Sequence, residues 1–385
     1  MPSFAARVFA FKFFDALVLI YPLYTVMFVA RGLTPVQVSA TLMAWSITAF
    51  LVQIPSGVLA DKYSRRWILA GAQLLRAIGF AAWIIWPSFA GCLIGMMLWG
   101  AKSAFSNGTF EALVFDELQA EGRTEDYPRV IGRAQAIGYG SILLASLGAA
   151  ATVKFGYTAL LSASIATALG AAVAAIALPR ARQTARTSRN YFALLSSGFQ
   201  TVAHTPLILG LIAFAALSNA FGGGLEGFWP IFGGLAGLGS AQIAIFVAAL
   251  SGAQAAGAMF AHRLRNLPTS VFFAIFMLIG ILTVTAAGVL KPWSTVLVMA
   301  LCGLFKMVDV NLDARLHDAM PSQTRATVAA AKSFSGQVVM TGMFMAFGGL
   351  AQGASYQAAF LASGGAVMLI GLFCLIRLRV PPQTI

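Results

Sequence analysis

Long apolar runs recur along the whole chain, and short polar segments separate them. Each run approaches the length of about 20 residues that a helix needs to cross a bilayer. The runs are expected to be helical, since no other open structure satisfies its own backbone hydrogen bonds inside lipid. The pattern predicts an all-α membrane protein with twelve transmembrane helices. The predicted spans are residues 7–30, 36–59, 67–87, 90–115, 132–153, 157–178, 205–231, 239–260, 269–290, 294–316, 327–350 and 355–377.

Composition agrees with this pattern. Hydrophobic residues make up 59% of the chain and the mean hydropathy is +0.84. Charged residues make up 10%, against about 25% in soluble domains. The net charge of +13 does not indicate nucleic acid, because the basic residues are scattered in short loops. Of the 25 lysines and arginines, 17 lie in the N-terminal segment and the loops on its side, and 3 lie in the opposite loops. Basic residues accumulate in cytoplasmic loops, so both termini are predicted to be cytoplasmic.

The two halves of the chain resemble each other. The basic segment Pro179–Asn190 lies at the midpoint, where it reads as a linker or as an ordinary cytoplasmic loop. We predict two pseudo-symmetric six-helix bundles, residues 1–179 and 205–385, joined by a linker at 180–204. Three matches between the halves recur in order, as expected for a duplicated transporter fold. They are Gly32–Gln37 with Gly237–Gln242, Lys102 with Lys306, and Glu111–Asp116 with Asp313–Asp318, at offsets of 205, 204 and 202.

A sequence motif stands between the second and third predicted spans. It runs from Gly57 to Arg66 and reads GVLADKYSRR. It resembles the loop signature of the major facilitator superfamily, G-x-x-x-D-[RK]-x-G-x-[RK]-[RK], with Ser64 at the usual glycine and the last basic pair shifted by one. Gly57 is expected to permit close helix approach, and Asp61 to lie near a helix N-terminus, where the dipole favours an anion. The resemblance implies a bacterial transporter of the branch that exports drugs or organic solutes, although the fifth span lacks that branch's proline.

Ionisable groups inside the predicted spans are costly and usually functional. In the family that the motif resembles, spans 1, 4, 7 and 10 line the central cavity, and most buried charges of this chain lie on those spans. Internal salt bridges that only lock helices together are the alternative reading. We predict that Glu226 and Asp309 carry protons. The residues predicted to bind substrate are Lys12, Asp15, Lys102, Ser106, Thr109, Trp229 and Lys306.

Charged groups at the cytoplasmic ends of the helices have a predicted gating role. Asp116 and Asp318 end spans 4 and 10, where they can pair with Arg65, Arg66, Arg263 or Arg265, or remain solvated helix ends. The predicted gating set is Gly57, Asp61, Lys62, Arg65, Arg66, Asp116 and Asp318.

No catalytic motif, nucleotide-binding loop or metal-ligand spacing occurs in the sequence. We therefore expect no enzyme activity, no cofactor and no metal. The predicted function is a secondary transporter that moves a small organic solute by alternating access, with proton-coupled efflux favoured. Lys102 and Lys306, on corresponding helices of the two halves, favour a solute with an anionic group. Proton-coupled uptake is the runner-up, and a non-transporting receptor has the same sequence features. The predicted partners are the solute, protons and the lipid bilayer of the bacterial inner membrane, with a monomeric protein.

Overall fold

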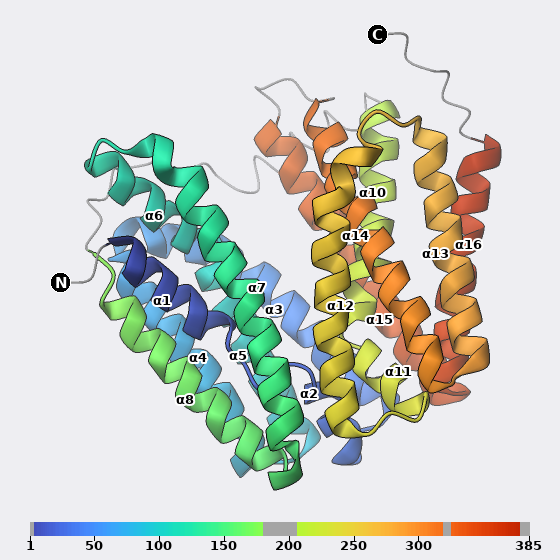
Figure 1. The fold of residues 1–385 in the computed structure, drawn as a ribbon, viewed down its shortest axis with the longest axis horizontal. Helices are drawn as coiled ribbons and strands as arrows, with labels where there is room; N and C mark the ends of the chain where they lie inside the picture. The colour runs from blue at the N-terminus through green and yellow to red at the C-terminus, as the bar shows by residue number, and fades with distance from the viewer. Residues whose placement is uncertain (1–3, 180–205, 319–324, 378–385) are drawn as a thin grey trace. The chain divides into compact units, whose positions relative to one another are not determined.

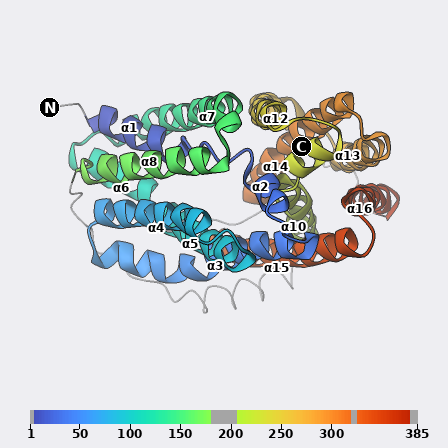
Figure 2. The same cartoon turned by 90° about the horizontal axis from the view of Figure 1, so that it is seen from below.

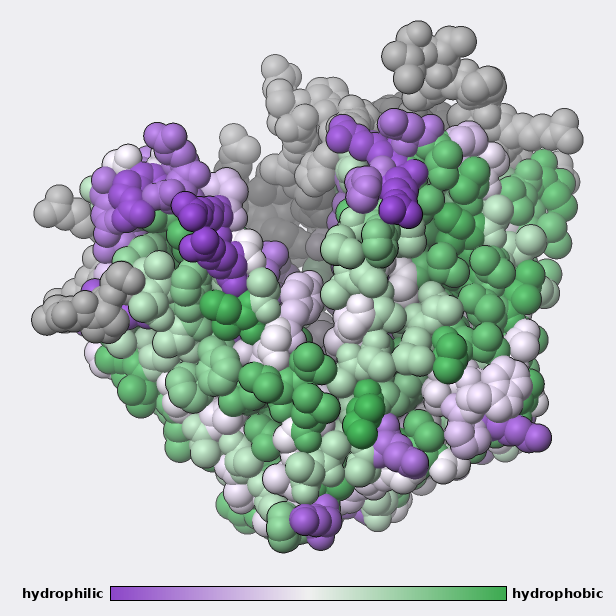
Figure 3. All heavy atoms as spheres, in the orientation of Figure 1, coloured by the Kyte–Doolittle hydropathy of each residue, from purple (hydrophilic) through white to green (hydrophobic). Residues whose placement is uncertain are grey.

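The computed structural model describes residues 4–179, 206–318 and 325–377. Within these ranges the regular structure consists of α-helices and short 3-10 turns. Ten helical segments are long and apolar enough to cross a membrane, and they correspond to predicted spans 2–6 and 8–12. On the face shown in Figure 3, hydrophobic residues cover the middle of the helices and hydrophilic residues gather at helix ends. The predicted all-α membrane fold is confirmed.

The chain divides into two compact units (Figure 1). One unit contains residues 1–33 and 40–188, and the other contains residues 34–39 and 189–385. The predicted linker at 180–204 lies outside the described residues, so the bundle boundaries stay a prediction. We call the two parts the N-unit and the C-unit.

The N-unit holds the first eight helices, except for residues 35–39 at the start of α3, which belong to the C-unit. In the N-unit, α4 packs against both α8 and α5, side by side in Figure 2. A Cβ at Gly79 of α4 would lie 2.9 Å from the carbonyl oxygen of Gly95 in α5. Such small residues let membrane helices approach closely. The helices are α1 (Phe4–Ala16), α2 (Tyr24–Ala30), α3 (Pro35–Lys62), α4 (Arg65–Ile85), α5 (Phe89–Ser106), α6 (Thr109–Ala120), α7 (Tyr127–Thr152) and α8 (Tyr157–Ile176).

The C-unit uses the same principle of close packing. A Cβ at Gly280 of α13 would lie 2.4 Å from the backbone nitrogen of Met368 in α16, so only glycine fits between these two helices. The helices are α10 (Pro206–Glu226), α11 (Trp229–Leu235), α12 (Ser240–Phe260), α13 (Thr269–Val289), α14 (Thr295–Asp318), α15 (Arg325–Gly353) and α16 (Tyr356–Arg377).

Three predicted spans are divided rather than continuous. The first comprises α1 and α2, the seventh comprises α10 and α11, and the fourth comprises α5 and α6. Gly108 separates α5 from α6 with φ +77°, a conformation that glycine adopts without steric cost. Glu226 is the last residue of α10, so this helix ends within the glycine-rich segment Gly222–Pro230.

Candidate functional site

A buried polar cluster in the N-unit centres on Asp15 of α1. Lys102 of α5 places its Nζ 2.6 Å from Asp15 Oδ1, and Gln73 of α4 donates to the same oxygen at 2.7 Å. Arg76 of α4 donates from Nη1 to the Asp15 backbone oxygen at 2.7 Å and lies 3.8 Å from Oδ1. Lys12 is more distant, with Nζ 4.0 Å from Oδ2. Three helices therefore bring four polar side chains to one carboxylate.

The cluster carries an excess of two positive charges, because three cations surround one carboxylate. Its side chains are shielded, with 2% of Arg76, 10% of Lys102 and 12% of Asp15 exposed. A charged group at the centre of a bilayer costs about 2.5–3.5 kcal/mol on insertion scales. Asp15 offsets part of this cost, and a second anion would offset more.

Helical spacing explains how the cluster forms. Lys12 and Asp15 are three residues apart on α1, and Gln73 and Arg76 are three apart on α4, so each pair shares a helix face. The sequence marked Lys12, Asp15 and Lys102 as site residues. It left Arg76 without an assigned partner and passed over Gln73. The available signal was a second i, i+3 polar pair in an otherwise apolar helix.

Ser106 and Thr109 were predicted to continue the face of Lys102 on one helix. Ser106 does lie four residues after Lys102 in α5, but α6 begins at Thr109, so the helical spacing to Thr109 is lost. The Ser106 hydroxyl is buried and makes no hydrogen bond with any described residue. Thr109 is 5% exposed. Neither side chain has a contact to the Asp15 cluster among those that the structure describes.

The C-unit contains a pocket of about 160 Å³ between α10, α12 and α14. Glu226, Lys306 and Asp309 line it together, and Lys306 Nζ lies 2.9 Å from Asp309 Oδ2. These two side chains are 39% and 37% exposed, so the pair faces open space. The two predicted proton carriers thus share one pocket with a lysine. The complete lining is Ser218, Asn219, Gly222, Gly223, Glu226, Gln254, Cys302, Phe305, Lys306 and Asp309.

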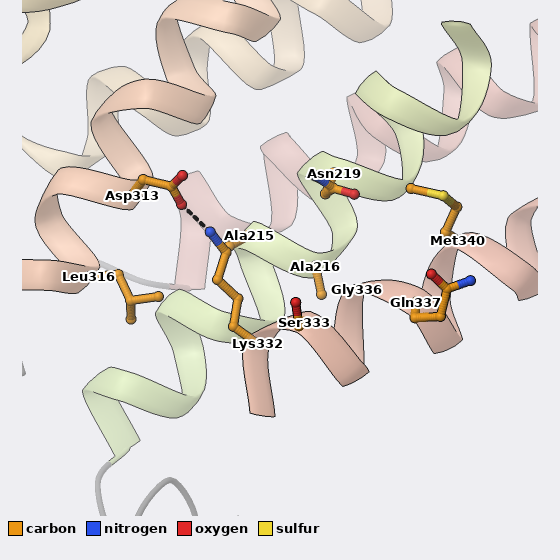
Figure 4. Close-up of a pocket in the computed structure, with 10 residues that line it drawn as sticks. All are labelled: Ala215, Ala216, Asn219, Asp313, Leu316, Lys332, Ser333, Gly336, Gln337 and Met340. Carbon is orange, nitrogen blue, oxygen red and sulfur yellow. Dashed lines mark hydrogen bonds and ion pairs between the residues drawn. The ribbon is translucent and has the colours of Figure 1, made fainter. Parts of the chain in front are cut away.

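A second C-unit pocket, of about 390 Å³, lies between α10, α14 and α15. Figure 4 shows Lys332 of α15 reaching across to Asp313 of α14, with which it forms an ion pair. Asn219 lines both pockets, and Ser333 and Gln337 add polar groups to this one. Sequence analysis left Lys332 without a partner and gave Asn219 and Gln337 no role, because a single polar residue in an apolar helix does not reveal its neighbours.

Trp229 was predicted to contact substrate. It lies in the hydrophobic core of the C-unit and is 2% exposed. Its ring stacks on Phe360, with centroids 5.3 Å apart. The indole is buried in this conformation, and its contact with substrate stays a prediction.

Of the predicted gating residues, the structure brings two together in the N-unit. Arg65, at the start of α4, forms an ion pair with Asp116 of α6, and both side chains are 5% exposed. Arg66 lies over the ring of Trp67, and Lys62 is exposed. A Cβ at Gly57 would meet no described atom within 4 Å, so the expected close helix approach at Gly57 is not seen. The side chains of Asp61 and Asp318 lie outside the described part of the structure.

The sequence matches the family model of the Major Facilitator Superfamily over residues 8–341. No curated protein sequence gives a significant match. A mutant of the nucleoside transporter NupG has a similar structure, with a TM-score of 0.84 and 14% identity over 98% of this chain and 100% of that one. An auto-inhibited POT family peptide transporter has a TM-score of 0.75 and 12% identity, over 99% of this chain and 98% of that one. PepTSo, another POT family transporter, has a TM-score of 0.71 and 11% identity, over 98% of each chain.

Fold and buried charges together define a helical membrane carrier with ionisable groups in both units. The chain belongs to the Major Facilitator Superfamily and is a multi-pass secondary transporter, not an enzyme. At 11–14% identity the similar structures establish the fold and do not assign a solute.

Proposed function

We propose that this protein carries a small organic anion across the membrane by alternating access, in exchange for protons. The observation that supports the anion is the Asp15 cluster, in which Lys12, Arg76 and Lys102 outnumber the single carboxylate. Buried cations in a membrane protein need compensating anions. A solute with an anionic group supplies the missing charge when it binds.

The proposed proton site is the pocket that Glu226, Lys306 and Asp309 line. Asp309 accepts a hydrogen bond from the Lys306 ammonium at 2.9 Å, and Glu226 adds a second carboxylate. Protonation of either acid changes the charge of this pocket by one unit. An exchange of protons for solute needs such a group within reach of the transport pathway.

We favour efflux because the loop from Gly57 to Arg66 resembles that of exporters in this family. We place the protein as a monomer in a bacterial inner membrane with both termini in the cytoplasm, on the 17-to-3 distribution of basic residues. Reporter fusions test the orientation. A fusion after Arg66 is expected to report the cytoplasm and a fusion at Lys154 the opposite side. A cytoplasmic signal at Lys154 would refute the assignment.

Transport is tested with the purified protein in liposomes. A thermal-shift screen of metabolites and drugs first identifies solutes that stabilise the protein, and labelled solute then reports flux. We expect an anionic solute to move faster when protons run in the opposite direction, and a protonophore to remove the acceleration. Acceleration by protons that run in the same direction would make the protein an uptake symporter. Binding without flux would make it a receptor.

A further inference from the structure

Arg76 has one side of its guanidinium group unused. Its Nη1 donates to the backbone oxygen of Asp15. Its Nε and Nη2 are buried and make no hydrogen bond with any residue that the structure describes. These two nitrogens lie on the same edge of the planar group, the edge that binds two oxygens of a carboxylate or phosphate side by side.

Asp15 does not satisfy this edge. Its Oδ1 already accepts from Lys102 at 2.6 Å and from Gln73 at 2.7 Å. Its Oδ2 has Lys12 at 4.0 Å, beyond hydrogen-bond distance. Unpaired donors of a buried charged group carry a desolvation cost that a bound acceptor removes. Among the described residues, the Arg76 edge and the Lys12 ammonium thus have no carboxylate oxygen within hydrogen-bond distance, although Asp15 lies 3.8 Å from Nη1 of Arg76 and 4.0 Å from the Lys12 ammonium.

Lys12 provides the accessible part of the cluster. Its side chain is 27% exposed, whereas Arg76 is 2% exposed. The aliphatic stem of Lys12 lies against Gly138 of α7, where a Cβ would come within 3.2 Å of Cε. An incoming anion would meet Lys12 first. It reaches the edge of Arg76 when the side chains around α1 and α4 separate, as both nitrogens are closed to solvent in this conformation.

We infer that the oxyanion of the transported solute, a carboxylate or a phosphate, binds to Nε and Nη2 of Arg76, with the Lys12 ammonium as its second contact. Asp15 stays with Lys102 and Gln73 and holds these cations in place. This inference rests on the proposed function. It narrows the solute class to organic carboxylates and phosphates, in which two oxygens can accept from the two nitrogens at once. Chloride, which offers a single acceptor atom, is excluded as a good ligand.

Thermal unfolding and calorimetry on the purified full chain test this site at fixed ionic strength. The probes are succinate against its neutral analogue succinamide, and inorganic phosphate against chloride. We expect succinate, phosphate or both to raise the unfolding temperature, and succinamide and chloride to leave it unchanged. The first pair reports a carboxylate site and the second a phosphate site. Failure of both anions to stabilise the wild type would overturn the inference.

Three variants locate the binding. Arg76→Lys keeps the charge and removes the planar edge, so we expect about tenfold weaker anion binding. Lys12→Gln should weaken it by about threefold, since its only ionic contact to a described residue is the 4.0 Å approach to Asp15. Lys154→Gln removes an exposed cation outside the cluster and should bind as the wild type does. If Arg76→Lys does not fold, the anion affinity of Lys12→Gln tests the site. Wild-type affinity in the variants that fold would overturn the site.

Liposome flux separates this inference from the proposed function. A protein that binds succinate through Arg76 but moves no solute would keep the anion site and refute transport. If the wild type and Arg76→Lys transport a neutral or cationic solute equally well, the protein is a carrier but the anion site is refuted.

Discussion

The two units place related charges in different settings. Lys102 and Lys306 stand 204 residues apart in corresponding helices, and Asn219 follows Asp15 at the same offset. In the N-unit, Lys102 pairs with an acid on another helix and is 10% exposed. In the C-unit, Lys306 pairs with Asp309 on its own helix and is 39% exposed. Lys102 is thus part of an interhelical cluster, whereas Lys306, at the corresponding position, forms part of a pocket wall.

The difference separates two roles. A buried pair between helices fixes their arrangement, and the extra cations leave that cluster short of an anion. The Lys306–Asp309 pair joins two residues of one helix, lines a pocket and is open to protons and solute. Gly280 follows Arg76 at the offset of 204, so the C-unit has close helix packing where the N-unit has its guanidinium. Corresponding positions of the two halves therefore carry different chemistry.

The ends of the same helices show a second contrast. In the N-unit, Arg65 at the start of α4 pairs with Asp116 of α6. In the C-unit, Arg315 of α14 donates to Thr269 Oγ1, at the start of α13, at 3.1 Å, and also to the backbone oxygen of Leu267. In the C-unit the segment before α13, Ala261–Arg265, contains no acidic residue. The arginine that links these two helices lies on α14 and not at the start of α13.

The largest expected effect is on stability, from Asp15→Asn. It removes the one carboxylate that the described structure places beside Lys102, Arg76 and Lys12. Breaking a buried charge pair costs about 3–5 kcal/mol. Asp309→Asn is the C-unit counterpart and should cost less than about 1 kcal/mol, because its pair is exposed. Unfolding in detergent measures both. Equal losses of stability in the two variants would contradict the proposed difference between the units.

A second prediction concerns the Arg65–Asp116 pair. Arg65→Ala should slow transport by about tenfold and leave solute affinity within a few-fold, because the pair lies at helix ends and not in either pocket. Asp116→Ala should act alike, and the double variant should add little, as for partners in one interaction. Flux and binding are measured on the same preparations. Loss of binding in either single variant would place this pair in the solute site.

The pH dependence of flux tests the C-unit pocket. Lys306→Ala should change the pH profile, because it removes the cation 2.9 Å from Asp309 and changes the charge of the pocket by one unit. The pocket retains Glu226 and Cys302 as its other ionisable groups. Lys291→Ala, in an exposed loop, is the control and should leave the profile in place. An unmoved profile with Lys306→Ala would remove Asp309 from proton coupling.

The smallest predicted effect comes from Gly138→Ala. The new Cβ would press on Cε of Lys12 from 3.2 Å and shift the ammonium, which we expect to weaken anion binding about twofold. Gly140→Ala on the same helix is the matched control, since its Cβ would meet no described atom within 4 Å. Calorimetry with succinate compares them. Identical affinities would show that the position of Lys12 is not critical.

Sequence patterns were sufficient for the helices and for most of the charged positions. Apolar run lengths indicated the spans, because a span depends on one segment of chain. The Lys306–Asp309 pair is equally local, since i, i+3 spacing puts both side chains on one helix face. Contacts between helices depend on rotation and depth, so the pairing of Lys102 with Asp15 was beyond the sequence. The polar stripe from Lys102 through Ser106 does not continue to Thr109, because a glycine turn at Gly108 breaks the assumed helix.

The central claim is that protons drive an organic anion through this protein, and liposome flux tests it most directly. Vesicles containing the purified protein and labelled succinate or phosphate, whichever stabilises it more, are diluted into buffer of equal or lower external pH. The account predicts faster exit of the anion into the acidic buffer, with inward proton movement that requires both protein and anion and is lost in Asp309→Asn. Exit at the same rate with and without the pH gradient would contradict it.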